Sequence, residues 1–303
     1  MLVLGEVLWD CFPDRTTRLG GAPLNFAAHW TRLRHDPRLI TGVGADDLGE
    51  SARRAIAALG MDTQFVQTTA RFATGTASVQ IGPDDQPAFV IERPAAYDAV
   101  DVTDADLAEI VRWQPAWIYY GTLFPSAAGG RRTLRRLLQA LPDAARFYDL
   151  NLRPGFESRA LIRELSHAAD VVKLNEHELE VVGSLLHLPR DPEGFCRAGA
   201  SLCDWRAACV TLGPRGCAML VDGDYVEAAG VPVVVADTVG AGDAFAAAFL
   251  HGIASKWPAA SIAACANRAG AAVASRRGAI PSEAGEASTA VEATWPNVGT
   301  GGR

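Results

Sequence analysis

Short apolar runs alternate with amphipathic stretches along most of the chain. Six of these runs are predicted to form buried strands, at residues 1–8, 116–123, 145–150, 170–174, 207–212 and 231–236. Helical patterns separate them, for example residues 48–59, which Gly60 is placed to stop, and residues 131–140. This alternation predicts an α/β fold with a doubly wound, mostly parallel sheet flanked by helices.

One stretch departs from this rhythm. Residues 76–80 and 88–92 are β-like runs joined by a turn-rich connector, which is typical of a hairpin. With residues 11–19, they are expected to form a small antiparallel sheet that projects from the main domain. We therefore assign residues 11–20 and 62–98 to a β lid, and residues 1–10, 21–61 and 99–295 to an α/β core. The polar, glycine-rich tail at 296–303 is expected to be disordered.

Composition narrows the classes of protein. Of the 303 residues, 49% are hydrophobic and 21% are charged, as in ordinary globular proteins. The net charge of −7 does not favour binding to the phosphate backbone of a nucleic acid. No apolar run reaches the ~20 residues of a membrane helix, and the N-terminus lacks the features of a signal peptide. Six cysteines without a C-x-x-C pair fit a reducing compartment and disfavour structural zinc. We expect a cytoplasmic protein with no nucleic-acid or membrane partner.

The most informative segment is residues 236–250, ADTVGAGDAFAAAFL, where an apolar strand enters a glycine turn before an alanine-rich helix. Gly240 and Gly242 allow tight backbone conformations and the close approach of a ligand. The amides of Ala241, Gly242 and Asp243 are expected to form an anion site at the helix N-terminus. A carboxylate beside a phosphate site is useful in phosphoryl transfer, where it accepts the proton of the attacking hydroxyl. The alternative is that Asp243 merely caps the helix.

Polar and glycine residues also follow four of the predicted strands, at the sheet edge where parallel sheets bind ligands. They suit a nucleotide, a metal ion and a hydroxylated substrate: Asp149, Asn151, Arg153, Asn175, Glu178, Gly213, Gly216, Asp237 and Asp243. Asn175 and Glu178 share one face of a first helical turn, where Glu178 is placed to hold hydrated Mg²⁺ through water. The alternative for Glu178 is an acid that the helix dipole favours.

Near the N-terminus, residues 19–25 (LGGAPLN) open another helix, with Pro23 suited to its first turn. Asp10 and Asn25 offer complementary hydrogen bonds to sugar hydroxyls. Turn and N-cap chemistry alone explains the glycines but not why both polar groups converge. No G-x-x-x-x-G-K-[ST] motif is present, and Asp47 stands where a dinucleotide fingerprint needs its third glycine. A Walker-type ATPase is therefore excluded and a dehydrogenase is disfavoured.

At this point the chain resembles the PfkB (ribokinase-like) carbohydrate kinases, over residues 1–285. Both family signatures are present, as GGAPLNFAAHWTRL…ITGVGADDLGE and DTVGAGDAFAAAFL, and Asn175 and Glu178 match the family's N-x-x-E motif. The resemblance implies a ribokinase-like fold and an ATP-dependent kinase that transfers the γ-phosphate to a sugar hydroxyl. It also implies Mg²⁺ and, as in many members, K⁺.

The resemblance further implies roles for individual residues. Asp243 would be the catalytic base, with Gly240, Ala241 and Gly242 beside it in the anion hole. ATP contacts would be Asn175, Thr211, Gly213, Gly216 and Asn267, and sugar contacts would be Asp10, Gly21 and Asn25, joined by Asn151 and Arg153. Asp237, Val239, Val273, Arg276, Gly278 and Ser282 match the places around a monovalent cation. The small sheet looks like the family's lid, which closes over the sugar and can pair with another lid in a homodimer.

The choice of substrate stays open at this stage. GEVLWDCFP, LGGAPLNFA, RPAAYD and DLNLRPGF look most like bacterial fructokinases. The D-x-N-x-R pattern that ends at Arg153 also occurs in 2-keto-3-deoxygluconate kinases, where Arg153 or Arg93 would suit a carboxylate. Arg93 could equally be a solvated surface residue. A non-catalytic sugar or nucleotide sensor on the same fold is the alternative from another class, although a sensor need not keep GAGD and N-x-x-E.

Overall fold

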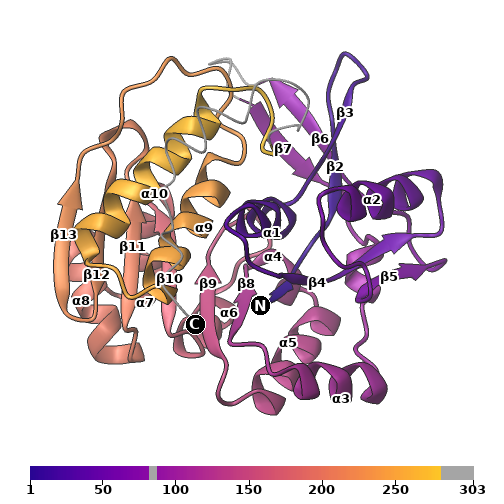
Figure 1. The fold of residues 1–303 in the computed structure, drawn as a ribbon, viewed down its shortest axis with the longest axis horizontal. Coiled ribbons are helices and arrows are strands. Elements are labelled where there is room, and N and C mark those ends of the chain that lie inside the picture. The colour runs from indigo at the N-terminus through magenta and orange to yellow at the C-terminus, as the bar shows by residue number, and fades with distance from the viewer. Residues whose placement is uncertain (82–86, 281–303) are drawn as a thin grey trace. The chain divides into compact units, whose positions relative to one another are not determined.

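The computed structural model describes residues 1–81 and 87–280, and it divides the chain into two compact units, Met1–Ala169 and Asp170–Arg303 (Figure 1). The predicted tail at 296–303 lies outside the described residues. The division into core and lid follows different boundaries from these units and stays a prediction.

The first unit is built on a parallel sheet whose strand order is β9-β8-β1-β4-β5. These strands are β1 (Leu2–Leu4), β4 (Arg38–Gly44), β5 (Val66–Thr69), β8 (Trp117–Tyr120) and β9 (Ala145–Asp149). Every residue of β1 is buried, as are six of the seven in β4, because helices cover both faces of a parallel sheet. The runs predicted at 1–8, 116–123 and 145–150 are thus confirmed as strands, the first of them shortened to β1.

The helices of the first unit follow the predicted patterns closely. They are α1 (Ala22–Arg32), α2 (Asp47–Ala58), α3 (Asp104–Trp113), α4 (Leu123–Ser126), α5 (Ala128–Ala140) and α6 (Arg159–His167), with a 3₁₀ turn η1 (Ala96–Ala99). Helix α2 ends just before Gly60, as the sequence predicts, and Gly60 takes a positive φ of 79°. A left-handed residue of this kind stops a helix, and glycine adopts that conformation at least cost.

The small sheet predicted for the lid is present at one end of the first unit (Figure 1). Its strand order is β3-β2-β6-β7, with β2 (Leu8–Cys11), β3 (Thr17–Gly20), β6 (Gly75–Ile81) and β7 (Pro87–Ile91). The pairs β2–β3 and β6–β7 are antiparallel, whereas β2 and β6 run parallel. A parallel pair needs a long crossover connection, and the chain between β2 and β6 supplies one that contains β3, α1, β4, α2 and β5.

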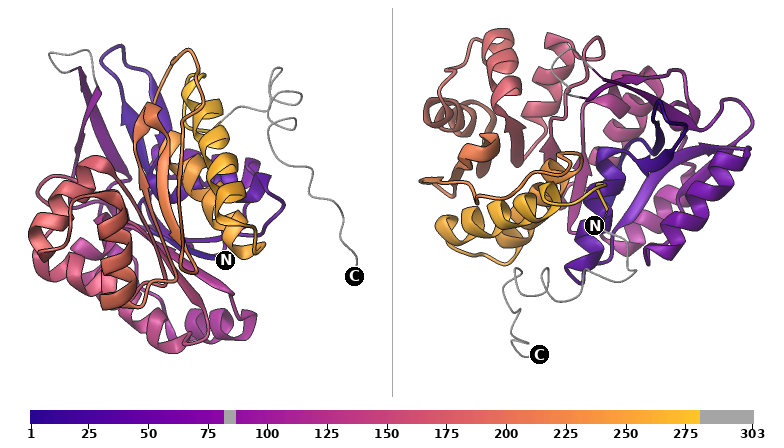
Figure 2. Two further views of the ribbon diagram at one scale, coloured as in Figure 1. Left: turned by 90° about the vertical axis from the view of Figure 1, so that its left-hand side faces the viewer. Right: turned by 90° about the horizontal axis from the view of Figure 1, so that it is seen from above.

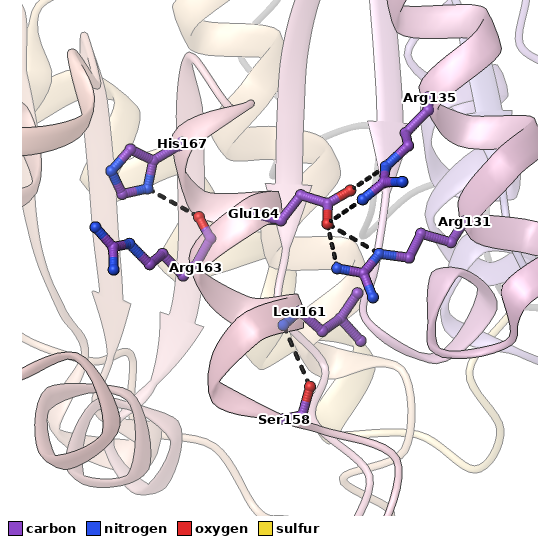
Figure 3. Close-up of polar contacts among 7 residues, drawn as sticks. All are labelled: Arg131, Arg135, Ser158, Leu161, Arg163, Glu164 and His167. Atoms are coloured by element: carbon purple, nitrogen blue, oxygen red, sulfur yellow. Dashed lines mark hydrogen bonds and ion pairs between the residues drawn. The ribbon is translucent and has the colours of Figure 1, made fainter.

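Helices α5 and α6 of this unit are joined by one carboxylate (Figure 3). Glu164 accepts hydrogen bonds from Arg131, with Nε 2.9 Å from Oε2, and from Arg135, with Nε 2.6 Å from Oε1. The side chain of Ser158 caps α6 by accepting from the N–H of Leu161 at 3.2 Å. The Ser158 cap fixes the start of α6, immediately after the loop that carries Asn151 and Arg153, and the Glu164 contacts hold the helix against α5.

The second unit carries four hydrogen-bonded strands. The strands β10 (Val171–Asn175) and β11 (Ala207–Thr211) are parallel, and β12 (Cys217–Val221) and β13 (Asp224–Ala228) follow as an antiparallel hairpin. Its helices are α7 (Glu176–Leu186), α8 (Pro192–Cys203), α9 (Ala241–Ala254) and α10 (Ala259–Ala274), with a 3₁₀ turn η2 (Gly213–Arg215). Helix α8 packs on one face of these strands and the pair α9–α10 on the other (Figure 2). The mixed α/β class, mostly parallel with flanking helices, is therefore confirmed.

The strand predicted at residues 231–236 is wrong. This segment belongs to no strand, and Val234 and Val235 are 89% and 60% exposed. The edge of the sheet is instead occupied by the β12–β13 hairpin, whose two-residue turn, Asp222–Gly223, has φ values of 48° and 94°. Two positive φ values match the type I′ turn that Asp-Gly favours. Across the described residues, no helix is long and apolar enough to cross a membrane.

Candidate active site

The N-terminus of α9 is set by a glycine that no other residue can replace without strain. Gly240 takes a φ of 79° at the N-cap position, and a Cβ on it would lie 2.3 Å from the Cβ of Ala279. Asp243 lies in the first turn of α9 with only 7% of its surface exposed. The N-cap is thus Gly240 rather than Asp243, so simple capping does not account for the carboxylate.

The three amides predicted to form the anion hole differ in what they bind. The N–H of Ala241 donates to the carbonyl of Thr238 at 3.3 Å, and the N–H of Asp243 donates to that of Gly240 at 3.1 Å. Within the described chain, the N–H of Gly242 has no backbone acceptor. Gly242 therefore offers the amide of this turn that is available to an anion.

Asn175 and Glu178 hold each other at the start of α7. The N–H of Asn175 donates to Oε2 of Glu178 at 2.8 Å, and the N–H of Glu178 donates to Oδ1 of Asn175 at 2.9 Å. This reciprocal arrangement is a capping box, and it places Glu178 in a buried position, 4% exposed. Asn175 also lies directly across from Thr211 on the neighbouring strand. The structure thus brings these three predicted residues together at one sheet edge.

The turn after β11 contributes the predicted glycines. Gly213 has a φ of 59° and Gly216 a φ of 102°, and a Cβ on Gly216 would lie 2.0 Å from the carbonyl oxygen of Ala228. Asn267 of α10 donates from Nδ2 to the carbonyls of Ala228 and Ala229, at 3.3 and 3.1 Å. Gly216 and Asn267 therefore border the same short segment after β13, although the amide of Asn267 is engaged there.

Most residues predicted to surround a monovalent cation lie close together, in the segments at 237–239 and 273–278. Asp237 accepts from the N–H of Val239 through Oδ1 and from the N–H of Gly278 through Oδ2, each at 3.0 Å. The N–H of Arg276 donates to the carbonyl of Val273 at 3.0 Å, in the turn that ends α10. Ser282 lies outside the described residues. Nowhere in residues 1–81 or 87–280 do three His, Cys, Asp or Glu side chains cluster as ligands for a metal.

In the first unit, the predicted sugar residues gather around the Gly20–Gly21 turn. The carboxylate of Asp10 lies against it, since a Cβ on Gly20 would be 2.9 Å from Oδ2. Gly21 has a φ of 109°, and its carbonyl accepts from the N–H of Asn25 at 2.9 Å. Asp10 and Asn25 are both buried, 9% and 4% exposed. The sequence reasoning passed over Gly20, although the paired glycines mark it.

Asn151 and Arg153 lie in the loop after β9. Asn151 takes a positive φ of 43°, and its buried Nδ2 has no hydrogen-bond partner in the described part of the chain. A guanidinium nitrogen of Arg153 donates to the carbonyl of Leu152 at 3.2 Å. The buried, unsatisfied amide of Asn151 is what a ligand hydroxyl would complete.

Arg93 is not a solvated surface residue. Only 11% of its side chain is exposed, and it forms an ion pair with Asp98, next to a cavity of about 580 Å³ in the first unit. One guanidinium nitrogen of Arg93 also donates to the hydroxyl of Ser126 at 2.6 Å and to the carbonyl of Leu123 at 3.1 Å. Because a carboxylate already faces Arg93, Arg153 is the better candidate for recognising an acidic substrate.

The sequence reasoning missed Lys173. Its side chain is 3% exposed, and its Nζ lies 3.8 Å from the position that a Cβ on Gly242 would take. The available signal was compositional, since Lys173 is one of only two lysines among 28 basic residues and stands within an apolar strand.

Comparison with known proteins shows similarity over most of the chain. A family model described as pfkB family carbohydrate kinase matches residues 12–284. The fructokinase of Klebsiella pneumoniae is 30% identical over 264 residues, which cover 83% of this chain and 83% of that protein. These matches extend through nearly all the described residues of both units.

Solved structures share the fold at lower identity. The fructokinase with bound ATP from Xylella fastidiosa has a TM-score of 0.80 and 22% identity, covering 92% of this chain and 93% of its own. The fructokinase from Vibrio cholerae O395, in a form with fructose, ADP and calcium, has a TM-score of 0.77 and 22% identity, covering 92% and 94%. The 2-dehydro-3-deoxygluconokinase from Thermotoga maritima has a TM-score of 0.82 and 18% identity, with the same coverage. These likenesses establish the common fold, and the match of the family model over most of the chain places this protein in the PfkB family of carbohydrate kinases.

Proposed function

We propose that this PfkB-family kinase transfers the γ-phosphate of ATP to a hydroxyl of fructose, with Asp243 as the general base. The observation that carries the mechanism is the buried Asp243 carboxylate one residue from the available amide of Gly242. The choice of fructose is supported by the relative named fructokinase, whose 30% identity spans 83% of both chains.

In the proposed reaction, the sugar hydroxyl gives its proton to Asp243 as its oxygen attacks the γ-phosphorus. The bond from that phosphorus to the bridging oxygen breaks, and ADP leaves with that oxygen. The N–H of Gly242 stabilises the charge on the transferred group, as preorganised amides do in other anion holes. Sugar hydroxyls are proposed to bind Asp10, Gly21 and Asn25.

The nucleotide and ions have proposed positions in the second unit. ATP is assigned to the strand ends and glycine turn that carry Asn175, Thr211, Gly213, Gly216 and, beside them, Asn267. Glu178 is the proposed contact to Mg²⁺ through water, which fits because one of its carboxylate oxygens already caps α7 and Mg²⁺ retains most of its own waters. Bound Mg²⁺ would neutralise phosphate charge. The backbone around Asp237, Val239, Val273, Arg276 and Gly278 is the proposed monovalent cation site.

A second candidate substrate is 2-keto-3-deoxygluconate. It is favoured by Arg153, a cation in the loop after β9 that has no carboxylate partner among residues 1–81 and 87–280. A guanidinium without an acid is suited to the carboxylate of a keto-acid sugar. Substitution of Arg153 by Met would then raise the KM for the keto-acid while leaving that for fructose almost unchanged.

The test is ATP-dependent phosphorylation across fructose, ribose, 2-keto-3-deoxygluconate, tagatose and adenosine, with Mg²⁺ and with or without K⁺. Preference for fructose would support the proposal, and preference for the keto-acid would support the second candidate. Asp243→Asn should lower kcat by roughly 10²–10⁴-fold while ATP still binds. Near-normal turnover by this variant would overturn the mechanism, and absence of turnover by the wild-type protein despite ATP binding would favour a sensor.

Two further expectations belong to the same proposal. A lid that covers the sugar can pair with a second lid, so we expect a homodimer. Measurement of the molecular mass in solution by sedimentation equilibrium would detect it. A kinase that draws on ATP works in the compartment that supplies it, so we expect a cytoplasmic location, which cell fractionation would test.

A further inference from the structure

Lys173 lies on the face of the second unit that carries the proposed nucleotide residues. Side chains alternate along a strand, so Lys173 and Asn175 of β10 point to the same face. Their partners across the pair with β11 are Cys209 and Thr211. Asn267 of α10 donates to the carbonyl of Ala228, which lies directly across from Cys217, and Cys217 in turn lies directly across from Thr211. This shared face is therefore the one that α10 and its neighbour α9 cover.

Helix α9 brings its first turn to the same place. The Nζ of Lys173 lies 3.8 Å from the position of a Cβ on Gly242, next to the amide of this turn that is available to an anion. A helix N-terminus carries partial positive charge, so an ammonium group beside it is electrostatically unfavourable unless negative charge is near. The buried carboxylate of Asp243 supplies one negative charge, and a phosphoryl group would supply more.

The choice of lysine at this position is informative. The chain uses arginine for 26 of its 28 basic residues, and Lys256, the other lysine, is exposed. Burying an ammonium group costs several kcal/mol without compensating interactions, so an apolar strand normally excludes it. A compact ammonium group fits in a space where a planar guanidinium group would not. This is a reason for lysine at this position in a chain that otherwise uses arginine for almost all of its basic residues.

We infer that Lys173 is a catalytic residue that contacts the transferred phosphoryl group, together with the N–H of Gly242. This inference rests on the proposed function. The ammonium group stays protonated throughout and neutralises charge on the non-bridging oxygens of the γ-phosphoryl group, while Asp243 alone receives the proton of the sugar. Because ADP lacks that group, Lys173 distinguishes ATP from ADP.

The experiment compares Lys173→Met and Lys173→Arg with Lys256→Met, the matched control at the only other lysine. We expect Lys173→Met to lower kcat by about 10²–10³-fold, as loss of one anion-hole donor does, with the KM for sugar little changed. Calorimetry without sugar should show that it weakens ATP binding roughly tenfold more than ADP binding. Lys173→Arg should recover little of the ATP preference, because the planar guanidinium does not fit this buried position, and Lys256→Met should behave as wild type.

A Lys173→Met variant with wild-type kcat and an unchanged preference for ATP over ADP would overturn the inference. Failure of the wild-type protein to phosphorylate any sugar would instead overturn the proposed function, while the binding comparison would still test Lys173. If Lys173→Met does not fold, labelling of the wild-type protein with acetic anhydride replaces it. ATP, but not ADP, should then slow acetylation of Lys173 and leave Lys256 unaffected; equal protection by both nucleotides would reject the inference.

Discussion

Asp46 ties the start of α2 to Thr74 through both of its carboxylate oxygens. Oδ2 accepts from the N–H of Thr74 at 2.8 Å, and Oδ1 accepts from its hydroxyl at 2.6 Å and from the N–H of Gly49 at 2.8 Å. Burial opposes ionisation of Asp46, but the hydrogen bonds from Thr74 and Gly49 prevail and lower the pKa of the carboxyl. One side chain thus caps a helix and fixes the residue just before β6.

Replacing Asp46 by Ala should lower the free energy of unfolding by about 1–2 kcal/mol, the usual cost of losing an N-cap. Thr74→Val keeps the shape but removes a hydroxyl that also accepts from the buried N–H of Gly44 at 2.9 Å, so it should cost about 1–2 kcal/mol as well. Urea denaturation of both variants measures these losses. The control is Asp62→Ala, at an exposed position before β5, which should be nearly neutral. Equal stability of Asp46→Ala and wild type would contradict this interpretation.

Glu164 should make stability depend on acid pH. Hydrogen bonds from Arg135 and Arg131 lower the pKa of its carboxyl from 4.5 to about 2 (Figure 3). A lowered pKa contributes stability that is present above pH 4.5 and is lost as pH falls from there toward 2. Because solvent reaches these side chains, the contribution should be only about 0.5–1 kcal/mol. Thermal unfolding of Glu164→Gln at pH 7 should therefore show a small loss that shrinks toward pH 2.

The matched control is Glu50→Gln. Glu50 pairs with Arg54 within α2, but both side chains are about two-thirds exposed, at 69% and 66%. Such pairs contribute little, so Glu50→Gln should not change the melting temperature measurably at either pH. A loss in Glu164→Gln that is the same at pH 7 and pH 2 would rule out the ion pairs as its cause.

Gly240 and Gly242 should respond differently to alanine. A Cβ on Gly240 would lie 2.3 Å from that of Ala279, in a left-handed backbone with φ 79°, so Gly240→Ala should unfold at lower temperature by several degrees. A Cβ on Gly242 meets only Nζ of Lys173, at the ordinary distance of 3.8 Å. Gly242→Ala should therefore keep its melting temperature. Calorimetry of the two variants side by side checks this, and equal losses would show that the turn is equally intolerant at both positions.

The strands that the sequence predicted correctly are those with a physical reason to be continuous apolar runs. Strands β1, β8, β9, β10 and β11 are mostly buried, so hydrophobicity alone located them. The run at 231–236 is equally apolar but exposed, so the same rule failed there. The hairpin that takes the sheet edge carried a different signal, Asp222–Gly223, which periodicity does not register.

Residues of the candidate site divide in a similar way. Asn175, Glu178 and the turn at Gly240 are close in sequence to helix starts, so local spacing was enough to group them. Lys173 and Gly242 are far apart in the sequence and meet only because α9 packs on the face of β10. Contacts of that kind depend on tertiary packing, which a single sequence does not display.

Asp237 should control the response of the enzyme to monovalent cations. Its two oxygens hold the N–H groups of Val239 and Gly278, each at 3.0 Å, so the carboxylate fixes two backbone segments of the proposed cation site. Asp237→Asn replaces one oxygen by an NH₂ group that cannot accept a hydrogen bond, which should release one of the two segments. We expect the affinity for K⁺ to fall about tenfold or more. The K⁺ concentration that gives a half-maximal rate should therefore rise by the same factor. The control for a general loss of charge is Asp224→Asn, at the exposed start of β13. A wild-type K⁺ response in the Asp237→Asn enzyme would place the cation elsewhere.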